Sequence, residues 1–348
     1  MRTTIRDVAL ASGFSTATVS RVINDDISVS PETARRVRAE VERLGYTMNR
    51  VARSLKTRST HTVGVIAPEL ASGFFMLLAE SMDRELSAHG YSLIVCTSWE
   101  SAEEEASRMR LLSERLVDGI VLIPAGGSGD LPAENGARPA RQPGRGATPL
   151  VLVDRLAPGV EADAVLADNE GGAYAATMAL AAEGIAQGRR RMGFVGGSLE
   201  VSTARERYEG WLRAMRDSGL APEAEFTSFA GLSVAAGYEA MRIMRAKGGA
   251  PDAYFLVNAN LHLGATNYLV TEEGEDGPSR PAFAAFDEMP YAPLLKFCRY
   301  SVSQPVPEMG IRAARMLLGR MAGEREGPPE EARLPTTLIR HSTRYRNR

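Results

Sequence analysis

The chain has few of the residues that build disulfide frameworks or metal centres. Among its 348 residues are two cysteines, Cys96 and Cys298, and four histidines. Neither cysteine has a partner at metal-ligand spacing and the histidines occur singly, so we expect no disulfide, no metal site and no cofactor. We interpret both cysteines as small apolar side chains of a core.

Long apolar runs are also missing. No stretch approaches the roughly 20 apolar residues that cross a bilayer, and the N-terminus lacks the pattern of a signal peptide. We therefore expect no membrane contact and a cytoplasmic protein. Hydrophobic residues make up 44% of the chain, which at this length supports two or three domains with buried cores.

Charge is distributed unevenly along the chain. Residues 1–60 hold 11 Lys or Arg and 6 Asp or Glu, a net charge of +5, whereas the remainder holds 30 and 37, a net charge of −7. The overall net charge of −2 conceals this division. A basic head on an acidic body is the arrangement that binding to DNA phosphates requires.

The first 47 residues predict a helix-turn-helix. Thr4 and Asp7 mark a helix start, Gly13 can adopt the positive φ that ends this helix, Ser15 caps the second helix, and Pro31 opens a third. The N-terminal part of the second helix in such a motif meets base edges. Arginine can bond guanine there, and small methyl groups can contact thymine. The expected DNA contacts of the head are Thr4, Ser15, Thr16, Ala17, Thr18, Ser20, Arg21 and Asn24. A helical bundle without DNA contacts is the alternative, and the basic outer face disfavours it.

From Thr62 onward, short apolar runs alternate with amphipathic stretches. Strands are predicted over 63–67, 91–97, 119–123 and 149–154, with helices over 74–88 and 102–116. The rhythm restarts with strands over 191–196, 225–230, 254–257 and 281–286 and helices over 203–218, 233–247 and 261–271. This alternation predicts two doubly wound α/β lobes with parallel sheets, which bind ligand in the cleft at the carboxyl ends of the strands.

Two polar stretches interrupt this rhythm. Residues 125–148 are rich in Gly, Pro and Arg and lack the Gly-Lys-Ser/Thr ending of a phosphate loop, so they are predicted to form a flexible surface insertion. Residues 272–280 are predicted to form a second loop. The C-terminal tail contains no leucine heptads, which favours a dimer over a coiled-coil tetramer.

The head and the segment after it, Asn49-Arg50-Val51-Ala52-Arg53-Ser54-Leu55, resemble the LacI/GalR family of bacterial transcription regulators, and the resemblance covers nearly the whole chain. It implies a head over 1–47, a hinge helix within 48–60 and a two-lobed body over 61–348 that is similar to periplasmic binding proteins. Asn49, Ala52 and Leu55 would then enter the minor groove, with the leucine wedged into a central CG step. Without the family, 49–57 is a basic helix or linker. Met48 stands where the family usually has proline.

The resemblance also implies a cleft for a small-molecule effector such as a sugar. The residues that match the family's cleft positions are Phe74, Phe75, Asp154, Thr203, Arg207, Asn258 and Asp287. Carboxylates, amides and a guanidinium group can bond paired hydroxyls, and an aromatic face packs on sugar C–H groups. Ala259 stands where the family has an aspartate.

Three of these residues have other interpretations. Phe74 or Phe75 is equally compatible with a place in the core, and Arg207 with an ion pair to Glu206 or Glu209 on a solvated helix face. Trp211 is expected in the core.

These features predict a sequence-specific DNA-binding transcriptional regulator, a repressor under allosteric control by the effector. We expect a homodimer on a double-stranded, pseudo-palindromic operator with a central CG. A sugar-binding receptor without regulatory output is the alternative, which the basic head disfavours. An enzyme such as a sugar kinase is disfavoured because no Walker loop or paired histidines occur, so no catalytic residues are expected.

Overall fold

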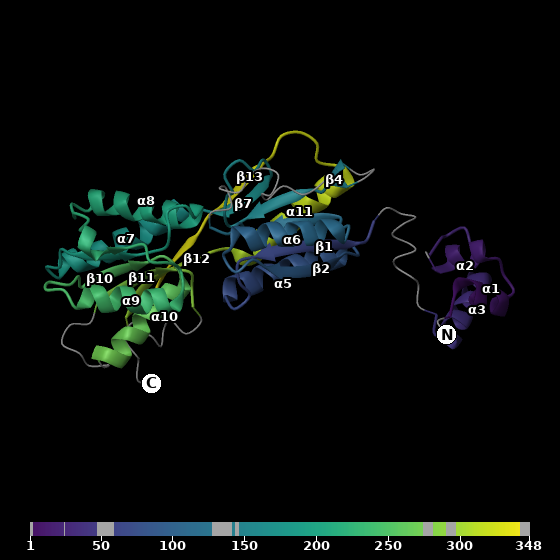
Figure 1. The fold of residues 1–348 in the computed structure, drawn as a ribbon, viewed down its shortest axis with the longest axis horizontal. Coiled ribbons are helices and arrows are strands. Elements are labelled where there is room, and N and C mark those ends of the chain that lie inside the picture. Colours follow the sequence, from purple (N-terminus) through teal and green to yellow (C-terminus); the bar gives the residue numbers. More distant parts are fainter. Residues whose placement is uncertain are drawn as a thin grey trace. The chain divides into compact units, whose positions relative to one another are not determined.

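The computed structural model of the chain describes residues 3–23, 25–46, 59–126, 141–142, 146–273, 281–289 and 297–341. Contacts divide it into two compact units, Met1–Thr60, which includes the head, and His61–Arg348, called here the body (Figure 1). Within the described ranges, no helix is both long enough and apolar enough to cross a membrane.

The described residues of the head form three helices: α1 (Ile5–Ser12), α2 (Thr16–Ile23) and α3 (Pro31–Arg43). Their ends follow the predicted signals. The Thr4 backbone N–H donates to the Asp7 carboxylate at 2.8 Å, which lowers the pKa of Asp7. Gly13 ends α1 at φ 76°, and the Ser15 hydroxyl accepts from the Thr18 backbone N–H at 3.1 Å. Such caps satisfy N–H groups that have no partner inside the helix.

The head has a small hydrophobic core of its own. Val8 of α1, Val19 and Val22 of α2 and Val37 of α3 are buried against one another. Their helical spacing gives each helix one apolar face. The core therefore fixes which side of α2 remains in solvent.

The first lobe of the body is a six-stranded sheet in the order β13-β7-β6-β3-β1-β2, with all neighbouring strands parallel. The strands are β1 (Thr62–Ala67), β2 (Ser92–Thr97), β3 (Gly119–Leu122), β6 (Leu150–Val153), β7 (Asp163–Ala167) and β13 (Glu331–Leu334). The helices are α5 (Gly73–Ala88), α6 (Ala102–Glu114) and α11 (Val306–Ala322).

Alternation along the strands of this lobe assigns its helices to two faces. Val63 and Val65 of β1 belong to a cluster with α5 and α11, whereas Ile66 packs with Met109 and Leu112 of α6. Successive side chains of a strand point to opposite faces. The continuous apolar runs of the sequence thus form a sheet that is buried on both sides.

The second lobe has the strand order β14-β12-β11-β10-β8-β9. Its strands are β8 (Met192–Val195), β9 (Thr227–Ser228), β10 (Ala253–Leu256), β11 (Ala282–Phe286), β12 (Cys298–Ser303) and β14 (Thr337–Arg340). Its helices are α7 (Asn169–Ala186), α8 (Ser202–Asp217), α9 (Val234–Arg245) and α10 (Ala259–Tyr268). β14 pairs antiparallel with β12 and the other pairs are parallel. The predicted pair of doubly wound lobes is confirmed, with β14 as an antiparallel edge strand.

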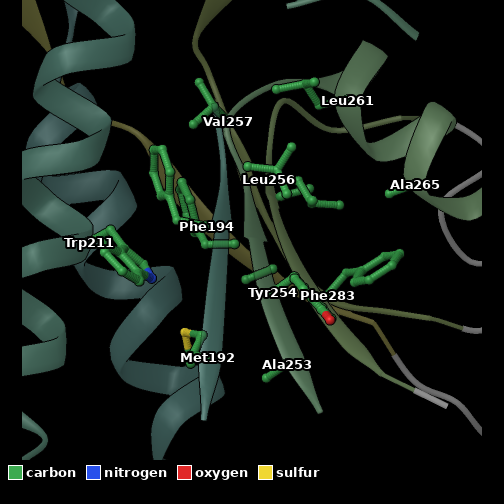
Figure 2. Packing of buried hydrophobic residues seen from close by; sticks show 14 of the residues in the cluster. Met192, Phe194, Trp211, Ala253, Tyr254, Leu256, Val257, Leu261, Ala265 and Phe283 are labelled. Carbon is green, nitrogen blue, oxygen red and sulfur yellow. The ribbon is translucent and has the colours of Figure 1, made fainter. Parts of the chain in front are cut away.

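Figure 2 shows how the second lobe is filled. Trp211 of α8 lies on one side of the strands together with Phe194 of β8, and Leu261 and Ala265 of α10 lie on the other. Trp211 is fully buried, as predicted, and its ring centroid lies 5.2 Å from that of Phe194. This packing holds the carboxyl ends of β8 and β10 in place.

The chain passes between the two lobes three times. It leaves the first lobe after β7 for α7, returns after β12 to α11, and leaves again after β13 for β14. The crossing segments are 168–169, 304–305 and 335–336. Neither lobe is therefore one continuous stretch of sequence.

Several predicted elements differ in extent from the observed ones. The strand expected over 225–230 is only β9, preceded by a 3-10 turn at Ala224–Phe226. The helix expected over 261–271 is α10 followed by a π-turn at Leu269–Glu273, so the start of the loop predicted at 272–280 is still helical. Within 125–148, the described residues include a short antiparallel pair, β4 (Arg141–Gln142) and β5 (Gly146–Ala147). Cys298 is buried, whereas Cys96 is only half-buried.

Candidate functional site

A cavity of about 340 Å³ lies where the strands of both lobes end. Its walls come from loops that follow strands of both sheets and from the first turns of α5, α8 and α10. Ligand sites of open α/β sheets occupy this position. All seven residues predicted for the cleft line this one cavity: Phe74, Phe75, Asp154, Thr203, Arg207, Asn258 and Asp287.

Two aspartates face the cavity from corresponding places in the two lobes. Asp154 directly follows β6 and Asp287 directly follows β11, and each of these strands is third from the same end of its sheet. Their φ angles are 67° and 68°. Residues other than glycine rarely adopt this left-handed conformation, and such residues cluster at ligand sites. The matched strain indicates that both carboxylates are held in position.

Asp154 is buried, with 6% of its surface exposed. Burial raises the pKa of its carboxyl group to about 6, although Arg155 and Arg207 favour the charged form. The Nε atom of Arg155 lies 3.6 Å from the Asp154 Oδ2 atom. Asp154 is therefore a costly buried charge that faces the cavity.

Arg155 is fixed by other groups. Its Nη1 and Nη2 atoms donate to the Glu100 carboxylate at 2.8 Å and 2.9 Å, and Nη1 also donates to the Pro124 carbonyl at 3.1 Å. Sequence reasoning missed Glu100, which precedes α6 and is distant from Arg155 along the chain. The forked geometry makes this pair a rigid part of the cavity wall.

Arg207 is buried in the first turns of α8, with 4% of its surface exposed. Its Nε donates to Asn169 Oδ1 at 2.9 Å and its Nη1 donates to the Val257 carbonyl at 2.9 Å. The guanidinium carbon lies 3.7 Å from the centroid of the Phe286 ring. Burial lowers the pKa of Arg207, opposed by the two cavity aspartates.

The alternative placement of Arg207 on a solvated face is wrong. Glu206 instead receives a hydrogen bond from Arg333 of β13 at 2.9 Å. That bond joins α8 of the second lobe to a strand of the first. The packing side of α8 is set by its apolar residues, and Arg207 lies on that side.

Asn258 and Asp287 organise the start of α10. Asn258 caps the helix by accepting from the Leu261 N–H at 2.8 Å, and its amide donates to the Leu232 carbonyl at 3.0 Å. Asp287 accepts from the Gln304 side chain at 2.6 Å and from the Ala259 N–H at 3.4 Å. Part of the hydrogen-bonding capacity of both residues is therefore used within the protein.

The aromatic wall of the cavity combines two environments. The rings of Phe74 and Phe75 meet edge to face with centroids 5.2 Å apart. Phe75 is 8% exposed and belongs to the core of the first lobe, whereas Phe74 is half-buried. Both interpretations of this pair thus apply at once: Phe75 is a core residue whose edge also lines the cavity. Thr203, in the first turn of α8, is also buried and lines the cavity.

Other lining residues were missed by sequence reasoning. Glu69 follows β1, and its carboxylate accepts from the Asn260 amide of α10 at 3.1 Å, which links the two lobes across the cavity. Gln304 lies in the second crossing segment. Polar residues just after strands were the available signal, but the partner of each depends on the tertiary fold.

The predicted DNA-reading residues occupy the start of α2. Thr16, Ala17 and Arg21 are exposed, and Thr18 and Ser20 are half-buried. Thr4 and Ser15 are exposed caps. The remaining predicted contacts, Asn24, Asn49, Ala52 and Leu55, lie outside the described residues, as does Met48.

Comparisons with known proteins agree with this architecture. Residues 4–49 match the bacterial regulatory proteins of the lacI family, and residues 60–341 match the periplasmic binding proteins and sugar binding domain of the LacI family. The HTH-type transcriptional repressor PurR of Haemophilus influenzae (strain PittEE) is 29% identical, over 98% of each chain.

Solved structures show the same likeness. A Lac repressor dimer bound to operator and the anti-inducer ONPF has a TM-score of 0.80 at 21% identity, over 99% of each chain. A complex of the transcriptional regulator CelR with cellobiose has a TM-score of 0.67 at 28% identity, covering 98% of this chain and 100% of that one. The chain thus belongs to the LacI family of bacterial regulatory proteins and is a DNA-binding transcriptional regulator.

Proposed function

We propose that the protein is a homodimeric repressor whose affinity for a pseudo-palindromic operator changes when a small molecule, such as a sugar, binds in the cavity of the body. The head would comprise residues 1–47, the hinge 48–60 and the body 61–348. The CelR–cellobiose complex supports a sugar-like effector, and the Lac repressor dimer on operator supports the assembly. Because the bacterial chromosome is its target, the protein would act in the cytoplasm, without catalysis.

One observation carries this proposal: two cavity residues bond directly to the segments that join the lobes. Arg207 donates to Asn169 in the first crossing segment, and Asp287 accepts from Gln304 in the second. A ligand that moves either side chain would therefore change the hydrogen bonds that hold the crossing segments 168–169 and 304–305. Allostery requires such a difference in contacts between two states.

The exposed start of α2 supports the DNA side of the proposal. Arg21 can donate two hydrogen bonds to a guanine, and the methyl groups of Thr16 and Ala17 can contact thymine. The net charge of +5 over residues 1–60 supplies the attraction to phosphate. Apolar residues exposed on the first lobe, Met76 and Leu77 of α5 and Val95 of β2, favour a second copy as the partner of that lobe.

Selection from a random DNA pool with the full-length protein tests this function. We expect a two-fold symmetric site with a central CG, and Leu55→Ala should weaken binding to that site by at least about tenfold, because the wedge would be lost. Binding to random DNA should change little, since phosphate contacts carry it. Absence of any enriched site would refute the proposal. If Leu55→Ala weakens binding to the selected site and to random DNA equally, Leu55 does not insert into the minor groove.

A further inference from the structure

The three crossing segments lie at one end of both sheets. β7 and β13 stand at one end of the first sheet, and β12 and β14 stand at the corresponding end of the second. Two of the segments are bonded to each other, because the Asp168 N–H donates to the Leu334 carbonyl at 2.8 Å and the Thr336 hydroxyl donates to the Asp168 carbonyl at 3.4 Å. A rotation of one lobe against the other therefore has its axis at this end.

Away from this end, a side-chain hydrogen bond joins the lobes across the cavity. Glu69 follows β1, and its Oε1 atom accepts from the amide of Asn260, in the first turn of α10, at 3.1 Å. β1 is three strand spacings from β7, which is roughly 14 Å. A rotation of about 10° about the crossing segments would move Glu69 by roughly 2.5 Å, which is enough to break a hydrogen bond.

The lobes also meet at a second place beside the cavity. A Cβ atom added to Gly126, which follows β3, would lie 3.2 Å from Cγ2 of Val201, which precedes α8. Both residues line the cavity. The closed arrangement thus rests on contacts that the protein makes with its own groups, and these contacts need no bound molecule.

The bond between Glu69 and Asn260 has the properties of a contact that can open and close. A hydrogen bond to a carboxylate is stronger than one between neutral groups. Both side chains are half-buried, so water can compete for them when the lobes separate. The charge of Glu69 also acts on Arg155, and Asn260 is therefore the partner whose replacement tests the bond with fewer side effects.

We propose that Glu69 and Asn260 form an inter-lobe latch, which holds the lobes closed over the cavity by protein contacts alone and has to open before a molecule enters or leaves. A hydrogen bond of this kind changes the ratio of closed to open molecules by about fivefold. The inference rests on the proposed function only in taking the cavity as a site for small molecules.

Alkylation of a cysteine inside the cavity measures this opening without DNA or ligand. Thr203 is 4% exposed and lines the cavity, so in full-length Thr203→Cys protein iodoacetamide should react with residue 203 only when the lobes separate. Peptide mass spectrometry follows the rate at this residue. Native Cys298, which is 2% exposed in the second lobe, reports any general unfolding in the same sample.

In this background, Asn260→Ala should raise the alkylation rate at residue 203 by about fivefold, because the bond is lost. Asn260→Asp places two carboxylates together and should raise the rate at least as much. Addition of Glu69→Gln to Asn260→Asp restores a donor and an acceptor in exchanged positions and should return the rate to within about twofold of the parent. The matched control is Asn267→Ala, at an exposed position of the same helix, which should leave the rate unchanged.

Equal rates in the parent, N260A and N260D would overturn the latch. A parallel rise at Cys298 would attribute the change to lost stability, and a double variant as fast as N260D would show that the two side chains do not act through each other. Either of these results also overturns the proposal. Because no DNA takes part, a failure of the operator selection would be seen separately.

Discussion

Burial raises the pKa of Asp154 and lowers the pKa of His262, so the two residues make stability depend on pH in opposite directions. Asp154 is buried beside the cavity, where burial raises the pKa of its carboxyl group and the neighbouring Arg155 and Arg207 partly offset that rise. His262 of α10 is 1% exposed and lies edge-on to Phe283, with ring centroids 5.8 Å apart. Each charge is costly because the surrounding protein solvates it poorly.

For Asp154, the folded protein holds the proton more tightly than the unfolded chain, because burial raises its pKa from 3.8 to about 6. The stability gained from the protonated form is fully present below about pH 4 and is lost as pH rises through 6. Asp154→Asn removes this loss. As pH rises from 4 to 7.5, the wild type should lose stability and the variant should not. The free energy of unfolding of the variant minus that of the wild type should therefore increase by about 1–3 kcal/mol over this range. Urea titrations at both pH values measure it, and a constant difference would contradict it.

For His262 the sign is reversed, since burial lowers its pKa to about 3. Its contribution to stability is complete above pH 6.5 and is lost as pH falls toward 3. His262→Leu should remove this acid sensitivity, so wild type should lose up to about 1.4 kcal/mol relative to the variant for each pH unit below 6.5. The control is His89→Leu, at the exposed end of α5. Parallel stability curves for H262L and wild type would show that the buried imidazole does not resist protonation.

At the scale of elements, paired helices approach each other through glycines. A side chain added at Gly210 of α8 would meet the Glu170 carbonyl of α7 and also Ala173 Cβ at 3.0 Å. At Gly184, near the end of α7, an added Cβ would have only an ordinary contact to Arg189 at 3.7 Å. Replacement of glycine by alanine is therefore crowded at Gly210 and has room at Gly184, although both residues belong to the same pair of helices.

Gly210→Ala should destabilise the protein by about 1–3 kcal/mol, because backbone atoms of α7 would have to move. Gly184→Ala should stabilise it by about 0.4–1 kcal/mol, because alanine loses less backbone entropy in a helix. Thermal unfolding of both variants compares the effects directly. Destabilisation by both substitutions in equal amount would show that helix propensity, rather than close packing, governs these positions.

Elements with strong local signals were predictable, and those that depend on the assembled fold were not. Strands such as β1 and β10 are continuous apolar runs, so their positions were predicted within one or two residues. The sequence analysis did not predict α7, whose apolar residues are mostly alanines that occur all around the helix and so give little helical periodicity. Nor did it predict α11 and β13, which return to the first lobe from the far end of the chain. Strand order is a property of three-dimensional packing and leaves no periodic trace.

The candidate site shows the same division. Resemblance to the family placed seven residues on one cavity, because their motifs survive in the sequence. The partners that fix these residues are set by contacts between distant segments. Asn169 holds Arg207, and Glu100 holds Arg155, the neighbour of Asp154. A carboxylate in a loop looks the same in sequence whether it faces solvent or a cavity.

At the scale of the whole molecule, DNA binding should belong entirely to the basic end of the chain. Residues 61–348 carry a net charge of −7 against +5 for the residues before them. The full chain should lose at least about tenfold in DNA affinity between 50 and 200 mM salt, since counterions return to the phosphates. The separate body should show no DNA binding at either concentration, as fluorescence anisotropy would measure. Salt-sensitive binding by the body would place phosphate contacts outside the head.

The three passages of the chain between the lobes also limit how such a protein can diversify by recombination. A gene crossover anywhere between codons 196 and 330, after β8 and before β13, would build each of the two sheets from the strands of two parents. Exchange near residue 60 would instead join an intact head to an intact body. New pairings of operator and effector are therefore open to gene shuffling, whereas a new ligand pocket has to arise by point substitution within an undivided body.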